Sequence, residues 1–207
     1  MSKFVITLSR QFGSLGRPIA QQLSELLGIE YYDRDIIGEV AKATKLPLAT
    51  VSNEEETVSS SYFSSMRFPL GNNTTEIQEV IFESEKRIIL NLVEKENCII
   101  VGRLAEYILK DYKNVLNIFI YAPYEARVQN CINSLFMSEK EAKMMIKSVD
   151  KARDNYHKHY TGYVASDYRH YHLMIDASRL GTNGTAQELA SYIKACFPSS
   201  TFKASYE

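Results

Sequence analysis

Ser9-Arg10-Gln11-Phe12-Gly13-Ser14-Leu15-Gly16-Arg17-Pro18 is the stretch that decides the fold of this chain. It follows a short apolar run at 4–8, which is typical of a buried β-strand. It precedes a run at 18–27 with apolar residues at helical spacing, and proline is favoured in the first turn of a helix. A glycine-containing turn at such a junction presents backbone N–H groups at a helix N-terminus, where the helix dipole favours anions. The stretch therefore predicts a phosphate-binding loop.

The literal P-loop pattern, G-x-x-x-x-G-K-[ST], is absent from this stretch. When its second glycine is aligned with Gly16, Gln11 stands at the first glycine, Arg17 at the lysine and Pro18 at the hydroxyl residue. Arg17 keeps a positive charge at the helix start, whereas Pro18 lacks the hydroxyl that binds Mg²⁺ in this motif. A glycine-rich turn without any ligand remains the alternative for the stretch taken alone. The candidate nucleotide-binding residues are Phe12, Gly13, Ser14, Leu15, Gly16 and Arg17.

The rest of the chain alternates between strand-like and helix-like runs. Short apolar runs at 29–32, 98–101, 115–122 and 173–175 predict strands. Helical patterns lie between them, and the longest cover 75–95 and 139–159. Short, continuously apolar strands separated by helices are typical of a parallel sheet that is covered on both faces. The sequence therefore predicts an α/β fold with three layers, α/β/α.

Composition excludes several other classes of protein. The 207 residues suit a single domain, and 24 Lys plus Arg against 25 Asp plus Glu give a net charge of −1. This balance excludes a protein that coats nucleic acid through a large cationic field. No apolar run is long enough to span a membrane, and the N-terminal residues lack the pattern of a secretory signal. Cys98, Cys131 and Cys196 are far apart, which argues against a disulfide framework or a zinc site and favours a cytoplasmic location.

Seven blocks carry a resemblance to a known family. They are ITLSRQFGSLGR at 6–17, YYDRDII at 31–37, IIVGRLAEYIL at 99–109, APYEAR at 122–127, DKARDNY at 150–156, YTG at 160–162 and IDASRLG at 175–181. In these blocks and in their order the chain resembles the cytidylate kinase-like family of P-loop proteins. The blocks span nearly the whole chain, and residues 46–95 are the part that resembles the family least.

The resemblance implies a P-loop NTPase fold with a five-stranded parallel sheet in one domain, residues 1–207. The core would comprise about 1–45, 96–137 and 171–197, with an acceptor-binding insertion at about 46–95 and a helical lid at about 138–170. The implied activity is transfer of the γ-phosphate of ATP to a nucleoside monophosphate such as CMP, or to a related small molecule. ATP and Mg²⁺ are the implied cofactors, and a small-molecule nucleotide is the implied partner, with no nucleic acid or membrane.

Phosphoryl transfer needs positive charge around the phosphates, and arginine suits two-pronged phosphate contacts better than lysine does. Ligands of open α/β sheets bind at the carboxyl ends of the strands. The candidates for acceptor binding follow two of the predicted strands: Asp33, Arg34, Gly102 and Arg103. The candidates for catalysis are Arg17 at the helix start, with Arg127 and Arg153 on the helices beside the lid. An ordinary surface ion pair is the alternative for each arginine.

Two roles are open for Asp33, because it follows the second strand and precedes a helix. It could hold Mg²⁺ through water or orient the acceptor, or it could cap the helix that begins after it. Asp150 and Asp154 flank Arg153, where they would either place that arginine or lie on the helix surface.

Departures from the family pattern leave a second function open. Closer cytidylate kinases carry Gly-Lys-Ser or Gly-Lys-Thr in the loop and an aspartate after the Gly-Arg turn. This chain has Gly16-Arg17-Pro18 and Gly102-Arg103-Leu104 at these places. ATP binding is thus the firmer expectation, and CMP as acceptor the weaker one. The alternative is a non-catalytic nucleotide-binding sensor or interaction module, which would bind ATP without turnover.

Overall fold

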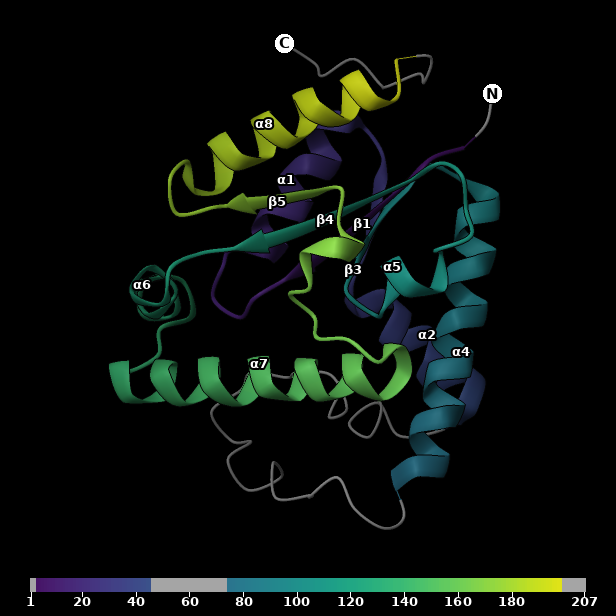
Figure 1. Ribbon diagram of the computed structural model, residues 1–207, viewed down its shortest axis with the longest axis horizontal. Helices are drawn as coiled ribbons and strands as arrows, with labels where there is room; N and C mark the ends of the chain where they lie inside the picture. The colour runs from purple at the N-terminus through teal and green to yellow at the C-terminus, as the bar shows by residue number, and fades with distance from the viewer. Residues whose placement is uncertain (1–2, 46–73, 199–207) are drawn as a thin grey trace.

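The structure of the chain, a computed structural model, describes residues 3–45 and 74–198 (Figure 1). Five parallel strands form one sheet in the order β2-β3-β1-β4-β5. Their bounds are β1 Val5–Arg10, β2 Glu30–Tyr32, β3 Cys98–Val101, β4 Val115–Tyr121 and β5 Leu173–Asp176. The central strand β1 pairs with β3 on one side and with β4 on the other. The predicted five-stranded parallel sheet is confirmed.

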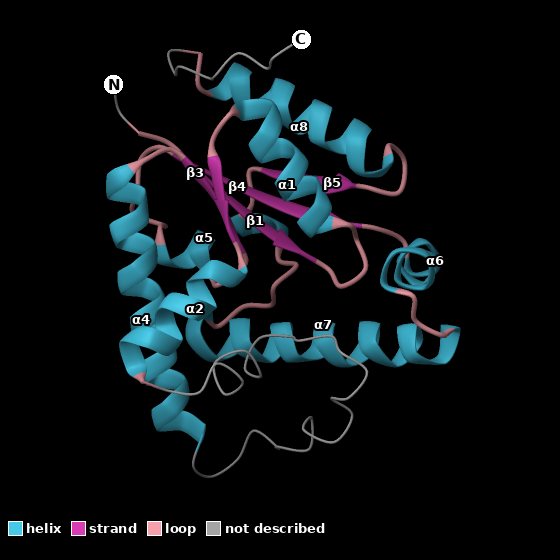
Figure 2. Cartoon of the chain, turned by 180° about the vertical axis from the view of Figure 1, so that it is seen from behind, coloured by secondary structure: helices cyan, strands magenta, loops and turns pink. Residues whose placement is uncertain are grey.

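Helices cover both faces of this sheet (Figures 1 and 2). On one face lie α1 (Gly16–Leu27) and α8 (Gly181–Cys196), which pack against each other. On the other lie α2 (Arg34–Thr44), α4 (Thr74–Lys95) and the short α5 (Ala105–Ile108). Alternate residues of β1 serve the two faces, since Ile6 and Leu8 pack with α1 and α8 while Val5 packs with α2 and α4. The three-layer α/β/α architecture is confirmed.

Two further helices follow β4 and lie beside the loop that ends β1. They are α6 (Tyr124–Leu135) and α7 (Glu139–Thr161), and they share a small core with Phe12 of the loop. Ser138 begins α7 with a capping box, in which its side chain and that of Glu141 satisfy each other's backbone N–H groups. Figure 1 shows α7 running below the sheet, and Phe82 of α4 stacks on Tyr160 near its C-terminal end, with ring centroids 4.1 Å apart.

The predicted insertion and lid are described in part. Residues 46–73 of the insertion lie outside the described residues. The remainder is α4, whose apolar face packs with α2 against the sheet. The predicted lid at 138–170 contains α7 and one turn of 3₁₀ helix, Tyr168–His170. In the ranges 3–45 and 74–198, no helix has the length and apolar character needed to cross a membrane.

Candidate functional site

The predicted phosphate loop closes tightly onto the end of β4. Ser14 is fully buried, and its hydroxyl donates to the carbonyl oxygens of Gln11, at 2.9 Å, and Ile120, at 3.1 Å. Gly13 has φ +77°, and a Cβ there would lie 2.9 Å from both the Arg127 carbonyl oxygen and the Cys131 sulfur. Glycine is therefore required at this position by both backbone conformation and space.

The first turn of α1 opens toward the carboxyl edge of the sheet. Its cap residue, Leu15, has φ +64° and makes no side-chain capping hydrogen bond. The first N–H groups of a helix have no partner within the helix, and an uncapped N-terminus attracts anions. Pro18 lacks an N–H group, so the backbone donors of this turn are the N–H groups of Gly16 and Arg17. No side-chain capping bond from Leu15 competes with a ligand for them.

Four arginines from four segments surround Asp33 at this edge. Arg10 ends β1 and lies 3.6 Å from an Asp33 carboxylate oxygen, while the Nε atom of Arg17 donates to the other oxygen. Arg103, in the turn after β3, donates to the Asp33 backbone carbonyl at 3.5 Å. Arg153 of α7 donates to the Arg10 carbonyl at 2.6 Å. The charges of Arg10 and Arg17 also lower the pKa of Arg153, after burial itself, which places these three cations within reach of one another.

A second carboxylate lies in this cluster beside Asp33. It belongs to the fully buried Glu85 of α4, which lies 3.1 Å from Arg103 and accepts from the Tyr156 hydroxyl at 3.3 Å. Within ranges 3–45 and 74–198, four guanidinium groups therefore gather around two carboxylates. Burial raises the pKa of Glu85 above its ordinary value, while the Tyr156 hydroxyl acts in the opposite direction.

Burial also disfavours the charged forms of the arginines. It lowers the pKa of Arg103 to about 9 and that of Arg10 to about 10, although Asp33 acts in the opposite direction. Burial opposes the ionisation of Asp33 too, but the charges of Arg10 and Arg17 outweigh it and hold the pKa of this carboxyl below its ordinary value. The cluster is consequently a desolvated, cationic site, and an anion that enters it would relieve the repulsion.

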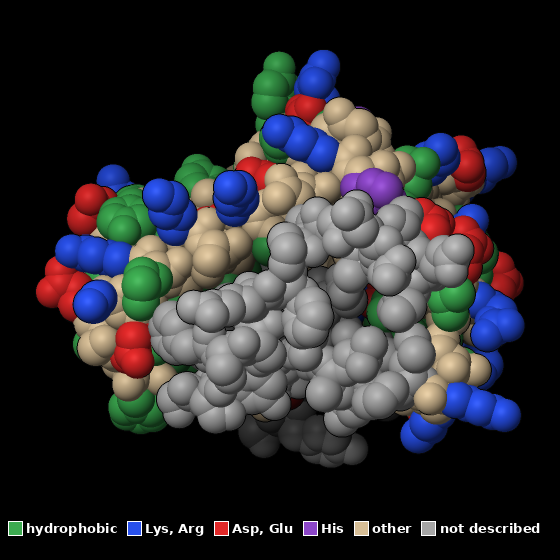
Figure 3. All heavy atoms as spheres, turned by 90° about the horizontal axis from the view of Figure 1, so that it is seen from below, with side chains coloured by type: hydrophobic (Ala, Val, Ile, Leu, Met, Phe, Trp, Pro, Cys, Tyr) green, Lys and Arg blue, Asp and Glu red, His purple; other side chains and the backbone are tan. Residues whose placement is uncertain are grey.

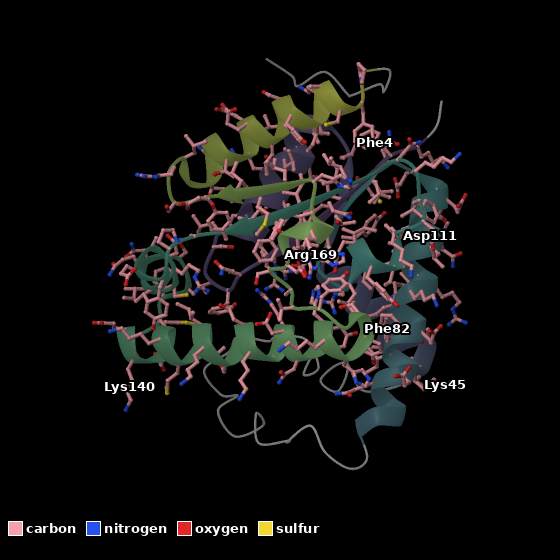
Figure 4. All side chains as sticks on the ribbon, viewed as in Figure 1. Phe4, Lys45, Phe82, Asp111, Lys140 and Arg169 are labelled. Atoms are coloured by element: carbon pink, nitrogen blue, oxygen red, sulfur yellow. The ribbon has the colours of Figure 1, made fainter. Side chains whose placement is uncertain are left out.

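The outer surface differs from this interior. On the face seen from below, the visible Lys and Arg side chains are interspersed with acidic and apolar ones (Figure 3). Nitrogen-tipped side chains are also visible between the sheet and α7 (Figure 4). The near-neutral net charge of the chain therefore coexists with a local concentration of positive charge.

The structure brings five of the twelve predicted site residues together. Arg17, Asp33, Gly102, Arg103 and Arg153 meet at the cluster. Asp33 precedes α2 but makes no side-chain capping bond, so its contacts favour a role in the site over the role of helix cap. The backbone of Arg34 begins α2, and its side chain lies outside the described residues.

Arg127 lies behind the loop instead of in the cluster. Its guanidinium pairs with Asp150 of α7 and donates to the Phe12 carbonyl at 3.3 Å. The same Asp150 accepts from the Phe12 backbone N–H at 2.9 Å. Of the two roles left open for Asp150, these contacts favour the one that places an arginine, although that arginine is Arg127 and not Arg153. Together the two side chains hold the loop against α6 and α7.

Arg10, Glu85 and Tyr156 belong to the site although the sequence did not single them out for it. Arg10 stood in the decisive stretch, but the P-loop pattern gives no role to a side chain at the end of the first strand. The sequence does contain a signal for Glu85, which lies on the apolar stripe of its helix between Ile81 and Ile88. A carboxylate on such a stripe indicates a buried polar partner.

The prediction that Asp33 holds Mg²⁺ through water stays a prediction, and the contacts of its carboxylate weigh against it. Its carboxylate is already paired with two guanidinium groups, and Arg103 and Arg153 lie beside it. A divalent cation at this point would be repelled by all four. Across the described ranges, no group of three or more His, Cys, Asp and Glu side chains is arranged to hold a metal ion.

A second buried polar group lies where the C-terminal end of α7 meets α5. Glu106 accepts from the Ser9 hydroxyl at 3.3 Å, and its other oxygen is 3.6 Å from Nδ1 of His157. Burial raises the pKa of Glu106 to about 7 and lowers that of His157 to about 4. Between these values both side chains are uncharged, so their contact is not a salt bridge at pH 5–6.

Comparison with solved structures shows the same fold. A protein from Eubacterium ventriosum described as uncharacterized is 25% identical, with a TM-score of 0.71, over 93% of this chain and 99% of that one. The shikimate kinase of Acinetobacter baumannii, solved with shikimate, is 16% identical, with a TM-score of 0.54, over 94% of each chain. The shikimate kinase of Bacteroides thetaiotaomicron is 10% identical, with a TM-score of 0.55, over 92% and 98%.

No curated protein matches the chain significantly. The sequence profile of the cytidylate kinase-like family, in contrast, matches residues 5–179. This range runs from β1 to the end of β5 and includes the phosphate loop, all four arginines of the cluster and α7. With most of its length matched, the chain belongs to the cytidylate kinase-like family.

Proposed function

We propose that this chain is an ATP-dependent kinase whose acceptor is a nucleoside monophosphate, CMP being the first candidate, or a related small phosphorylated molecule. The observation that carries the proposal is the convergence of four arginine side chains beside the open N-terminus of α1. Several like charges brought together in a desolvated place are costly to a folded protein, and an anion bound among them would offset that cost, which supports a site built for an anion. Phosphoryl transfer requires this environment, because negative charge gathers on the transferring group.

The positions of the residues suggest how the site is divided. The backbone of residues 12–17 and the side chain of Arg17 would hold the phosphates of ATP at the start of α1. Arg103, on the turn that begins at Gly102, and Arg34 would hold the phosphate of the acceptor. Arg153 would act on the transferring group from α7, where its guanidinium already reaches the end of β1. Arg127 would position the loop through Phe12.

A screen for acceptor-dependent ADP release tests the proposal. Purified protein is incubated with ATP and Mg²⁺, since kinases use ATP with the metal on its phosphates. Nucleoside monophosphates and small phosphorylated or hydroxylated metabolites are added one at a time. ADP release that rises with one acceptor and falls in Arg103→Met supports the kinase. Arg87→Met, which changes an exposed arginine on α4, is the matched control and is expected to leave the rate unchanged.

A non-catalytic nucleotide sensor is the second candidate, and two observations favour it. Pro18 stands where a P-loop carries its Mg²⁺-binding hydroxyl, and the carboxylate of Asp33 is engaged by Arg10 and Arg17. A sensor of this kind would bind ATP, and its binding would fall in Arg17→Ala, while no acceptor would raise ADP release. The same screen therefore separates the two functions.

A further inference from the structure

The side chain of Arg10 follows a path that only two glycines allow. A Cβ at Gly16 would lie 2.8 Å from Cβ of Arg10 and 3.1 Å from its Cδ. A Cβ at Gly102 would lie 2.6 Å from its Nη1 atom. The stem of Arg10 thus crosses the first residue of α1, and its guanidinium rests on the turn after β3. This path holds the charged group at the carboxyl edge, in front of the helix N-terminus.

The guanidinium of Arg10 is buried but only loosely paired. Its side chain is 11% exposed, and its distance to the Asp33 carboxylate is 3.6 Å. Charge-assisted hydrogen bonds of this type normally measure about 2.7–2.9 Å. Asp33 directs its other oxygen to Arg17 and so shares one negative charge between two cations. Arg10 therefore has donor capacity that this ion pair does not use, at a place where solvent screening is weak.

We propose that Arg10 binds a phosphate oxygen of the nucleotide, and that Asp33 is the internal counter-anion which competes with that phosphate for it. The proposal rests on the proposed function, because it names a further phosphate-binding residue of the same site. In this arrangement a phosphate-binding cation, Arg10, comes from the end of β1, and its side chain crosses in front of α1. The alignment with the P-loop pattern, in contrast, assigns the phosphate-binding cation to Arg17 at the helix start.

Arg10 is better preorganised for this role than Arg17. The side chain of Arg17 is 36% exposed, so part of its attraction for phosphate is screened by solvent. The stem of Arg10 is held against Gly16, and its backbone carbonyl is fixed by Arg153. A group held in place by its surroundings loses little conformational entropy when the ligand arrives. Its contact to phosphate is accordingly expected to contribute at least as much affinity as that of Arg17.

The test measures the binding of ATP, inorganic tripolyphosphate and adenosine by calorimetry at low salt. Arg10→Met removes the charge and keeps much of the stem, and it is expected to weaken ATP and tripolyphosphate binding about tenfold or more. Adenosine has no phosphate, so any affinity for it should stay unchanged. Asp33→Asn removes the competing anion and is expected to tighten tripolyphosphate binding severalfold. Arg87→Met is the control for loss of an arginine far from the glycines.

The outcomes separate this proposal from the proposed function. Wild-type affinity for tripolyphosphate in folded Arg10→Met, or weaker binding in Asp33→Asn, overturns the proposal and leaves the kinase intact. A wild-type protein that binds neither ATP nor tripolyphosphate overturns both. If Arg10→Met does not fold, Arg10→Lys replaces it, since lysine keeps the charge but loses the two-pronged donor. A loss of about threefold or more then supports the proposal, and an unchanged affinity overturns it.

Discussion

Arg17 is the second residue of α1, and its Nε atom is bound to Asp33. We expect Arg17→Ala to weaken ATP binding by about tenfold, because a charge-assisted contact to phosphate contributes roughly 1.5–3 kcal/mol. The loss should exceed that of any substitution in α7. Arg17→Lys should restore most of the affinity if a point charge suffices, and little of it if two-pronged geometry is needed. Calorimetric titration with ATP measures both variants.

Arg153→Ala is the comparison for that experiment. Its guanidinium approaches from α7, so we expect a lower rate of ADP release with a smaller loss of ATP affinity. A folded Arg17→Ala protein that binds ATP as tightly as the wild type would show that Arg17 does not hold the donor phosphates.

Individual site residues were predictable where they directly follow a strand, because the order of strands along the chain is enough to place them at the sheet edge. Arg17, Asp33 and Arg103 each follow a predicted strand, and parallel strands bring their carboxyl ends to one edge. Arg10 and Glu85 were not predictable in this way. The position of Arg10 depends on contacts with glycines 6 and 92 residues further along the chain, and that of Glu85 on how α4 is rotated against the sheet. Such contacts exist only in three dimensions.

At the scale of the elements, α7 is held to the rest of the molecule by polar contacts along its length. Asp150 binds the loop, Arg153 binds β1, Tyr156 binds Glu85 of α4 and His157 approaches Glu106 of α5. The last contact joins two titratable groups whose pKa values are shifted in opposite directions by burial. The packing of α7 against α5 is therefore expected to depend on pH through both side chains.

Glu106 and His157 are expected to oppose each other in the pH dependence of stability. The pKa of Glu106 rises from 4.5 to about 7 on folding, so its contribution is lost as pH rises through that range. The pKa of His157 falls from 6.5 to about 4, so its contribution is lost as pH falls. His157→Gln should therefore lose stability from pH 4.5 to 7, and Glu106→Gln from pH 6.5 to 4, each by up to about 3 kcal/mol.

Denaturant unfolding at intervals between pH 4 and 8 measures these slopes. The wild type should show a flatter profile than either variant, because its two contributions largely cancel over this range. Glu188→Gln, an exposed carboxylate on α8, is the control and should follow the wild type. Two variants with the profile of the wild type would contradict the opposed shifts.

Most element bounds agree with the sequence prediction, because apolar periodicity is strong in this chain. The predicted strands at 98–101 and 173–175 correspond to β3 and β5 within one residue. The first helix differs, since α1 begins at Gly16, whereas the pattern placed its start at Pro18. Leu15 adopts a left-handed conformation that ends the loop early. Leucine rarely adopts that conformation, so local propensity could not indicate it.

At the scale of the whole molecule, the cationic cluster lies where the loop, the sheet edge and α7 meet. An anion there would screen the repulsion among arginines from four separate segments. We expect hydrogen exchange at 155–170 to be faster than in the sheet without nucleotide, and to slow when ATP is added. Residues 46–73, which lie outside the described range, are expected to respond in the same way.

Mass-spectrometric exchange with and without ATP checks this expectation, and the sheet provides the internal reference. AMP and inorganic phosphate serve as further ligands, because they show how much of the response needs the whole triphosphate. Equal protection of both segments in the free and bound protein would argue against closure over the site.

Arg10 restricts which residues can occupy two positions that are distant from it in the sequence. Its stem leaves no room for a side chain at Gly16, and its guanidinium leaves none at Gly102. A mutation that enlarged Gly16 would be harmful in the presence of this arginine and tolerable only after its replacement by something shorter. Positions 10 and 16 should consequently diverge together, whereas Gly102, with φ +75°, is expected to stay glycine with or without the arginine.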